Sequence, residues 1–164
     1  MTRRLIVMRH AKSSWDHPGL RDHDRPLNGR GRRSAAALGR WLRDEGYLPD
    51  QILSSTSART RETCLRLGLD APADYLPALY HAAPSDMFGA LRGSTGQCVL
   101  MLGHNPGIAG FAEALMAVPP DHPRFPDYPT CATLVADFDL SDWRDLEPGT
   151  GRAVAFVIPR ELAP

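Results

Sequence analysis

Polar side chains suited to phosphoryl chemistry follow three apolar stretches of the sequence. Arg9 and His10 end the run LIVMRH, and His104 directly follows the run CVLMLG. Arg59 falls in the first turn of a helical segment that follows the apolar stretch QILS. Open α/β sheets bind ligands beyond the carboxyl ends of their strands. If the three stretches are neighbouring parallel strands, we expect these four side chains to converge on one ligand.

The chemistry of such a cluster is that of phosphoryl transfer. The two guanidinium groups, Arg9 and Arg59, can hold the non-bridging oxygens of a phosphoryl group through paired, charge-assisted hydrogen bonds. A neutral imidazole can attack phosphorus without a separate base, which makes His10 the candidate nucleophile. A protonated His104 would stabilise the charge on the transferring group. This chemistry requires no metal and no other cofactor.

Six apolar stretches indicate the strands that would position these residues. They alternate with segments of helical period, which is the pattern of a parallel α/β sheet. The stretch at 98–103 is continuously apolar, as expected of a strand that is covered on both faces. The expected strands are 5–8, 51–54, 76–80, 98–103, 132–138 and 153–158.

Capping residues mark the expected helices. Asn28 can cap a helix that runs to about Glu45, where Gly46 ends it. Ser57 can cap a helix over 58–67, and Gly68 can end it. Two further helices are expected to open at prolines, one at Pro84 and one at Pro106 behind an Asn105 cap.

Size and composition limit the class of protein. The 164 residues suit one domain that spans the whole chain, 1–164. No apolar run approaches the roughly 20 residues of a membrane span, and no signal-peptide core follows the first arginines. Three widely spaced cysteines argue against a disulfide framework. We therefore expect a cytoplasmic protein that does not bind a membrane.

The zero net charge conceals an uneven distribution. Residues 1–66 carry 14 basic and seven acidic side chains, whereas residues 67–164 carry five basic and 12 acidic ones. All but one of the basic residues are arginines, which suit paired contacts with phosphate oxygens. The basic residues are not interleaved with aromatic ones, so we expect no nucleic-acid partner.

The motifs in order resemble the histidine phosphatase superfamily, the phosphoglycerate-mutase-like proteins, and in particular its SixA-type phosphohistidine phosphatase branch. The resemblance implies a three-layer α/β/α sandwich with a mostly parallel central sheet. It also implies a covalent phosphohistidine on His10, in a pocket completed by Arg9, Arg59 and His104. The motifs that carry the resemblance are RHAKSSWD at 9–16, DRPLNGRGRR at 24–33, SSTSARTRET at 54–63 and GHNP at 103–106.

Other residues near these motifs are less certain contributors. Arg25 and Ser13 are further candidate phosphate contacts, although Arg25 is equally compatible with a plain loop arginine. Asp16 stands where many members of the family carry an asparagine that touches phosphate, and an ionised carboxylate there must turn away or pair with an arginine. Lys12, the only lysine, either attracts an anionic substrate or is simply solvated.

The sequence lacks the acidic residue that larger members use to protonate a leaving oxygen. That glutamate often follows an LY pair, but here LY at 79–80 is followed by His81 and two alanines. An alkoxide leaving group needs a general acid more than imidazole does, because the reference pKa of imidazole is only roughly 6.5. The pocket is therefore better matched to phosphorus–nitrogen bonds, although His81 or Asp24 are alternative proton donors.

Three functions remain open at this point. The first is a phosphatase for phosphohistidine on a signalling histidine-phosphotransfer domain or a phosphocarrier protein, acting as a monomer. The second is a phosphatase of small phosphomonoesters, and the third is a non-catalytic phosphate-binding regulatory module. No cysteine is followed by an arginine six positions later, so the phosphate loop of tyrosine phosphatases is missing. The proline-rich loop from 119 to 129 could flank the groove or merely connect elements, and we expect a connector.

Overall fold

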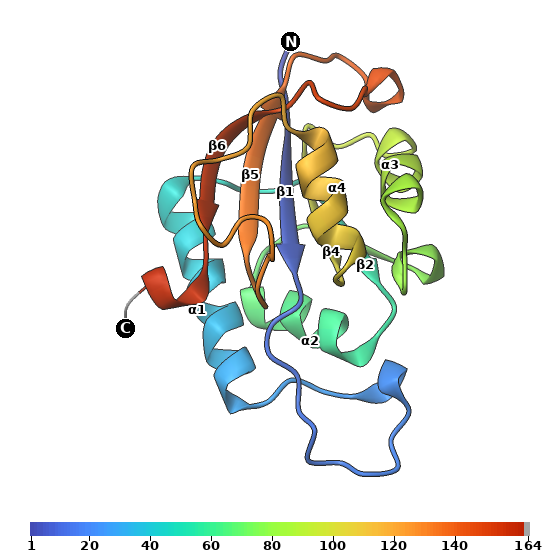
Figure 1. Ribbon diagram of the computed structural model, residues 1–164, viewed down its shortest axis with the longest axis vertical. Helices are drawn as coiled ribbons and strands as arrows, with labels where there is room; N and C mark the ends of the chain where they lie inside the picture. Colours follow the sequence, from blue (N-terminus) through green and yellow to red (C-terminus); the bar gives the residue numbers. More distant parts are fainter. Residues whose placement is uncertain (163–164) are drawn as a thin grey trace.

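The computed structural model describes residues 1–162 and contains a six-stranded sheet of order β3-β2-β4-β1-β5-β6 (Figure 1). The first four strands of that order are mutually parallel, and β5 runs antiparallel to both of its neighbours. The sheet is therefore mostly parallel, as expected. The strands are β1 (Arg3–Arg9), β2 (Gln51–Ser55), β3 (Ala73–Leu76), β4 (Cys98–Gly103), β5 (Thr133–Phe138) and β6 (Arg152–Val157).

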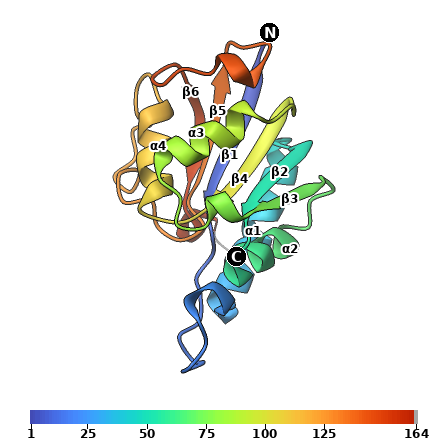
Figure 2. The same cartoon turned by 90° about the vertical axis from the view of Figure 1, so that its right-hand side faces the viewer.

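Helices cover both faces of this sheet. Helices α1 and α2 pack on one face, and α3 and α4 pack on the other (Figure 2). This arrangement confirms the three-layer α/β/α fold. Within residues 1–162, no helix combines the length and the apolar character that crossing a membrane requires. The helices are α1 (Gly29–Glu45), α2 (Ala58–Leu67), α3 (Pro84–Arg92) and α4 (Gly107–Leu115).

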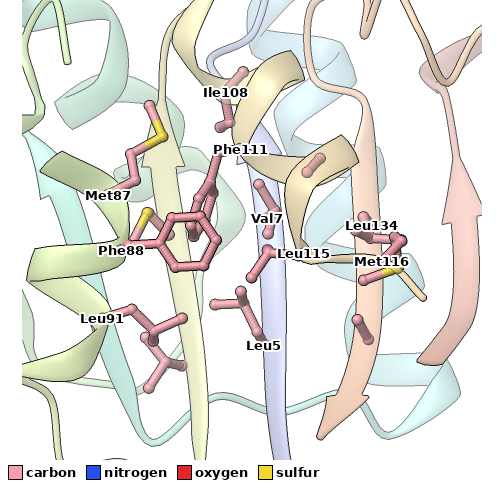
Figure 3. Close-up of a cluster of buried hydrophobic side chains, with 14 of the residues drawn as sticks. Leu5, Val7, Met87, Phe88, Leu91, Ile108, Phe111, Leu115, Met116 and Leu134 are labelled. Carbon is pink, nitrogen blue, oxygen red and sulfur yellow. The ribbon is translucent and has the colours of Figure 1, made fainter. Parts of the chain in front are cut away.

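The central strand β1 is buried on both sides because its side chains alternate between two cores. Leu5 and Val7 face α3 and α4, where they join the aromatic pair Phe88 and Phe111 (Figure 3). Ile6 and Met8 belong to the other core, beneath α1 and α2. The strand that carries the candidate nucleophile at its end is therefore fixed from both faces.

The expected capping residues position the first two helices. The Oδ1 atom of Asn28 accepts a hydrogen bond from the amide of Gly31 at 2.8 Å, and the Ser57 side chain caps α2 through the amide of Thr60. Both helices end at a glycine in the left-handed conformation. Gly31 also lets α1 pack closely on the preceding loop, because a Cβ there would collide with the backbone of Lys12.

Two expected boundaries are wrong. The third strand covers Ala73–Leu76 rather than 76–80, because Pro77 has no amide hydrogen for the ladder and instead starts a short 3-10 helix. Helix α4 begins at Gly107 rather than at Pro106, which follows a cis peptide bond and occupies the N-cap position. The expected cap, Asn105, still accepts a hydrogen bond from the amide of Ala109 at 3.2 Å.

The register of the sheet aligns the ends of the three strands that matter. Arg9 of β1 pairs with Gly103 of β4, and Ser54 of β2 pairs with Leu102 of β4. The last residues of β1, β2 and β4 therefore lie side by side. The loop between β1 and α1 extends past this edge, beyond the arrowhead of β1 (Figure 1).

Candidate functional site

The aligned strand ends bring together the four side chains expected to converge. The imidazole rings of His10 and His104 lie 5.2 Å apart between centroids, at an interplanar angle of 53°. Arg9 and Arg59 are close enough to both rings to disfavour their protonation. His10, His104 and Arg59 are all at least nine-tenths buried. The structure thus places two imidazoles and two guanidinium groups in one pocket.

His10 presents an unprotonated nitrogen to this pocket. Its Nδ1 atom lies 2.7 Å from the carbonyl oxygen of Ala11, and a carbonyl can only accept, so Nδ1 carries the proton. Burial lowers the pKa of His10 to about 3, and the nearby His104 and Arg9 act in the same direction. The ring is therefore neutral near pH 7, and Nε2 keeps a free lone pair.

Three buried nitrogen atoms of the pocket have no hydrogen-bond partner within residues 1–162. They are Nε of Arg9, Nε of Arg59 and Nδ1 of His104. A buried donor without an acceptor destabilises a protein by about 1–3 kcal/mol, so native structures rarely leave one unpaired. Unpartnered nitrogens on three of the four converging side chains mark this cluster as a candidate anion site.

His104 is held by hydroxyl groups at the end of β2. Its Nε2 atom lies 2.8 Å from Oγ of Ser55 and 3.5 Å from Oγ of Ser57. Burial lowers the pKa of His104 to about 3, and the nearby Arg59 lowers it further. The expected cationic His104 is therefore not found, because in the free protein this ring is neutral near pH 7.

Asp22 is a member of the site that sequence reasoning missed. Its carboxylate accepts hydrogen bonds from Nη2 of Arg59 at 3.0 Å, from Nε of Arg25 at 3.3 Å and from the Tyr80 hydroxyl at 2.7 Å. The Tyr80 hydrogen bond and the two arginines hold the pKa of this carboxyl well below its usual range. The spacing of Asp22 three residues before Arg25 was the only local signal of this role.

Arg25 and Ser13 contact each other in the loop between β1 and α1. Nη1 of Arg25 donates to Oγ of Ser13 at 2.9 Å, and its guanidinium stacks on the exposed ring of Trp15 at 3.5 Å. Both residues reach the pocket through Asp22, which Arg25 shares with Arg59. Their contact with phosphate therefore stays a prediction, while their support of the loop is visible.

The other ionisable residues considered from the sequence lie at exposed positions. Asp16 is exposed and forms no ion pair within residues 1–162. Of the two alternatives expected for its carboxylate, turning away or pairing with an arginine, the structure therefore shows the first. Lys12 is also exposed. Asp24 pairs with Arg21 at 3.4 Å on the outer side of the loop. His81 is exposed, but its ring stacks beside Tyr80 at 3.9 Å.

The proline-rich loop is more than a connector. The carbonyl of Tyr128 accepts hydrogen bonds from Nη1 of Arg9 at 3.3 Å and from the Asn105 side chain at 3.1 Å. The amide of Cys131 donates to the carbonyls of Arg9 and His10. The loop therefore braces the end of β1 and the turn after β4, and the expectation of a mere connection is wrong.

The two neutral imidazoles make the stability of the protein sensitive to acid. In the unfolded chain an imidazole binds a proton near pH 6.5, whereas in the fold both His10 and His104 have a pKa of about 3. Between these values the unfolded chain binds more protons, so the stabilisation is complete above pH 6.5 and is lost as the pH falls toward 3. Each ring contributes a slope of up to about 1.4 kcal/mol per pH unit.

We therefore expect the free energy of unfolding of His10→Gln to depend less steeply on pH than that of the wild type. Urea denaturation at several values between pH 7 and pH 4 measures the two slopes. His17→Gln, at an exposed loop position, serves as the control and should keep the wild-type slope. Equal slopes for His10→Gln and the wild type would contradict the buried, neutral state of His10.

Comparisons with known proteins agree with this geometry. The profile of the histidine phosphatase superfamily (branch 1) matches residues 5–90. A curated, uncharacterized protein of Mycobacterium tuberculosis (strain H37Rv) is 36% identical over 160 residues, which cover 93% of this chain and 100% of the relative. A related Mycobacterium leprae protein is 34% identical over 164 residues, with the same coverage.

Two solved structures are similar over almost their whole length. A candidate phosphohistidine phosphatase SixA from Nakamurella multipartitia superposes with a TM-score of 0.84 at 27% identity, covering 97% of each chain. Another candidate SixA, from Agrobacterium tumefaciens, superposes with a TM-score of 0.79 at 29% identity, covering 96% of this chain and 98% of that one. The fold described above is thus also found in these two solved structures.

Proposed function

Because the chain belongs to the histidine phosphatase superfamily, we propose that it hydrolyses phosphohistidine on another protein through a covalent phosphohistidine on His10. The observation that carries this proposal is the free Nε2 lone pair of a neutral His10 near two guanidinium groups, Arg9 and Arg59, whose buried Nε atoms have no hydrogen-bond partner within residues 1–162. A nucleophile and an oxyanion site in contact are what phosphoryl transfer requires.

The reaction has two steps. First, Nε2 of His10 forms a bond to phosphorus while the phosphorus–nitrogen bond of the substrate breaks. The other ring nitrogen of the substrate histidine is already protonated, so the ring keeps the electron pair and leaves as neutral imidazole. Second, water attacks the phosphohistidine, its proton is released, and inorganic phosphate leaves with His10 neutral again. Arg9 and Arg59 hold the non-bridging oxygens through both steps.

The leaving group is the basis for preferring phosphohistidine. His81 and the two alanines after it occupy the place where larger members of the family carry a glutamate, so the pocket has no carboxylic acid there. Imidazole departs more easily than an alkoxide, because its conjugate acid has a pKa of roughly 6.5. The similarity to candidate SixA phosphohistidine phosphatases supports the same preference.

The mouth of the pocket suits a side chain presented by a protein. The loop between β1 and α1 extends beyond the sheet edge (Figure 2). Its side chains Trp15 and Leu20 are exposed. Large exposed apolar side chains with basic neighbours, here Lys12 and Arg21, favour contact with a macromolecule over a small ester. The partners proposed are a histidine-phosphotransfer domain or a phosphocarrier protein.

A small phosphomonoester is the second candidate substrate. A cavity of about 390 Å³ adjoins His104 and is lined by residues 81–84 and 104–107. Its size would accommodate the organic part of a small metabolite. Asp16, the residue that most favoured a non-catalytic module, is turned away and leaves the pocket free for a phosphate.

Labelled phosphodonors test the proposal. We expect the wild-type protein to take up an acid-labile, base-stable phosphoryl label from a phosphohistidine protein and to release it as inorganic phosphate. The kcat/KM for that protein should exceed the value for a sugar phosphate by at least about 100-fold. A phosphoserine protein is the matched control and should be hydrolysed slowly.

Each other result points to a different function. Faster hydrolysis of the sugar phosphate would replace the proposal with the second candidate. Binding of phosphate without any label or turnover would leave a non-catalytic module. Either result would overturn phosphohistidine as the substrate.

A further inference from the structure

The two imidazoles of the pocket are held through different ring nitrogens. His10 is held at Nδ1 by a carbonyl and turns Nε2 toward the site, whereas His104 is held at Nε2 by Ser55 and leaves Nδ1 without a partner. A neutral imidazole has one donor and one acceptor nitrogen. The partner of each anchored nitrogen therefore decides whether the ring offers a lone pair or a proton to the ligand.

The hydroxyl groups around His104 fix which nitrogen carries its proton. Thr60 has one hydroxyl hydrogen, which it donates to a backbone carbonyl; that of Ser55 lies at 2.8 Å. The Thr60 oxygen can therefore accept a hydrogen bond from the Ser57 hydroxyl, also at 2.8 Å. The Ser57 hydrogen is then engaged with Thr60. The only hydroxyl hydrogen still to be placed near His104 is that of Ser55.

Ser55 has one direction left in which to donate. Its Oγ atom already accepts from the amide of Ser57 at 3.2 Å, and Nε2 of His104 is its only available acceptor within residues 1–162. If Nε2 carried a proton, the Ser55 hydrogen would be buried without any acceptor, because Ser55 is fully buried. A proton on Nε2 would thus leave two buried groups unpaired within residues 1–162, the Ser55 hydrogen and the Nδ1 lone pair, whereas a proton on Nδ1 leaves only that N–H unpaired. The contacts therefore favour donation from Ser55 to Nε2, with the proton of the neutral ring on Nδ1.

We infer that Ser55 is a positioning residue that holds His104 in the Nδ1–H tautomer, so that a neutral His104 donates a hydrogen bond to the phosphoryl group. The tautomer follows from the contacts alone, whereas the hydrogen bond to a phosphoryl group rests on the proposed function. Two imidazoles of the same pocket thereby acquire opposite roles: His10 offers a lone pair and His104 offers a proton.

The charges around His104 favour the neutral ring in the free protein. Arg59, His81 and Arg9 face it and disfavour a second positive charge, while Asp22 is the one carboxylate that favours it. The rings of His10 and Tyr80 lie at 5.2 Å and 5.5 Å and occupy the remaining sides. Asp22 is itself engaged by two arginines, so its charge is largely compensated.

Nitrogen-15 NMR of the imidazole rings tests the tautomer directly, without any substrate. Long-range proton–nitrogen correlations distinguish a protonated ring nitrogen from an unprotonated one, and the signals of His104 are assigned by their loss in His104→Gln. At pH 7 we expect protonated Nδ1 and unprotonated Nε2 for His104. A protonated Nε2, or two protonated nitrogens, would overturn the inference.

Variants of β2 test the part played by Ser55. Ser55→Ala should move the proton of His104 toward Nε2. The value of kcat/KM should then fall by about 10-fold, because the proton must return to Nδ1 before His104 can donate to the phosphoryl group. Ser55→Thr keeps the hydroxyl and should keep the wild-type tautomer. Ser54→Ala removes a buried hydroxyl that bonds only the Ser55 carbonyl, so it is the matched control.

The outcomes separate this inference from the proposed function. An unchanged tautomer in Ser55→Ala would refute the role of Ser55 even if the protein hydrolyses phosphohistidine. If the protein shows no turnover with any substrate, the NMR measurement still tests the tautomer of His104, because it needs no substrate. A shift of the tautomer in Ser54→Ala as well would show a general disturbance of β2 rather than a specific contact.

Discussion

Replacing His10 with alanine should abolish phosphoryl transfer and leave the binding of an oxyanion in place. The proposed nucleophile is lost, whereas the arginines and His104 that are proposed to hold the oxygens remain. Removal of a covalent nucleophile lowers kcat by about 10⁴-fold or more, because only the oxyanion site is left to assist water. Rapid-quench measurement of the label from a phosphohistidine donor gives kcat and the amount of phosphoprotein.

Binding supplies the second readout for this variant. Titration calorimetry with tungstate, a tetrahedral oxyanion, should give a Kd for His10→Ala within about 10-fold of the wild-type value, since one neutral ring is removed (about 1.4 kcal/mol). His17→Ala changes an exposed imidazole and should leave both activity and binding unchanged. A His10→Ala protein that still forms an acid-labile phosphoprotein would move the nucleophile to another histidine.

Replacing Arg59 with methionine should lower kcat/KM by on the order of 10³-fold, because the donors lost are charged, buried and already oriented. The guanidinium lies in the first turn of α2 and is only 5% exposed. Asp22 fixes its orientation through Nη2, and the backbone carbonyl of Asp22 accepts from Nη1 at 2.8 Å. Methionine fills much of the same volume without the charge.

The control for this variant lies two residues further along the helix. Arg61 is an arginine of the same turn that donates to the carbonyl of Thr56 and stacks on Tyr75. Arg61→Met should keep kcat/KM within a factor of about three. Substitutions at surface positions rarely change the free energy of unfolding by more than about ±0.5 kcal/mol, so the helix should stay intact. Steady-state kinetics with the phosphohistidine protein measures both variants. Equal losses in the two would show a damaged helix rather than a lost phosphate contact.

Much of the fold and the four central residues could be predicted, because their signals are local. Asn28 and Ser57 mark helix starts by their own hydrogen-bonding chemistry, and the apolar run before His104 marks a strand covered on both faces. Alternation of strands and helices then fixes parallel neighbours and a shared carboxyl edge. The third strand shows where such local prediction fails. The expected strand 76–80 included Pro77, whereas the observed strand ends at the residue before it.

The remaining parts of the site depend on contacts between distant segments. Asp22 acts on Arg59, which lies 37 residues away, and nothing in its own neighbourhood indicates that partner. Ser55 lies just after the expected strand 51–54, and its effect on His104 arises only when β2 and β4 are paired. The charge state of His104 was misjudged for the same reason, because burial is a property of the packed molecule.

The carboxylate of Asp22 has a consequence for the end of the catalytic cycle. Two bare guanidinium groups beside a helix terminus would retain inorganic phosphate and slow each round of turnover. Asp22 neutralises part of that positive charge through its ion pair with Arg59. The electrostatic attraction for an incoming anion is weaker as a result, and so is the affinity for the inorganic phosphate that must leave. The negative charge of Asp22 should thus speed the release of inorganic phosphate after each turnover.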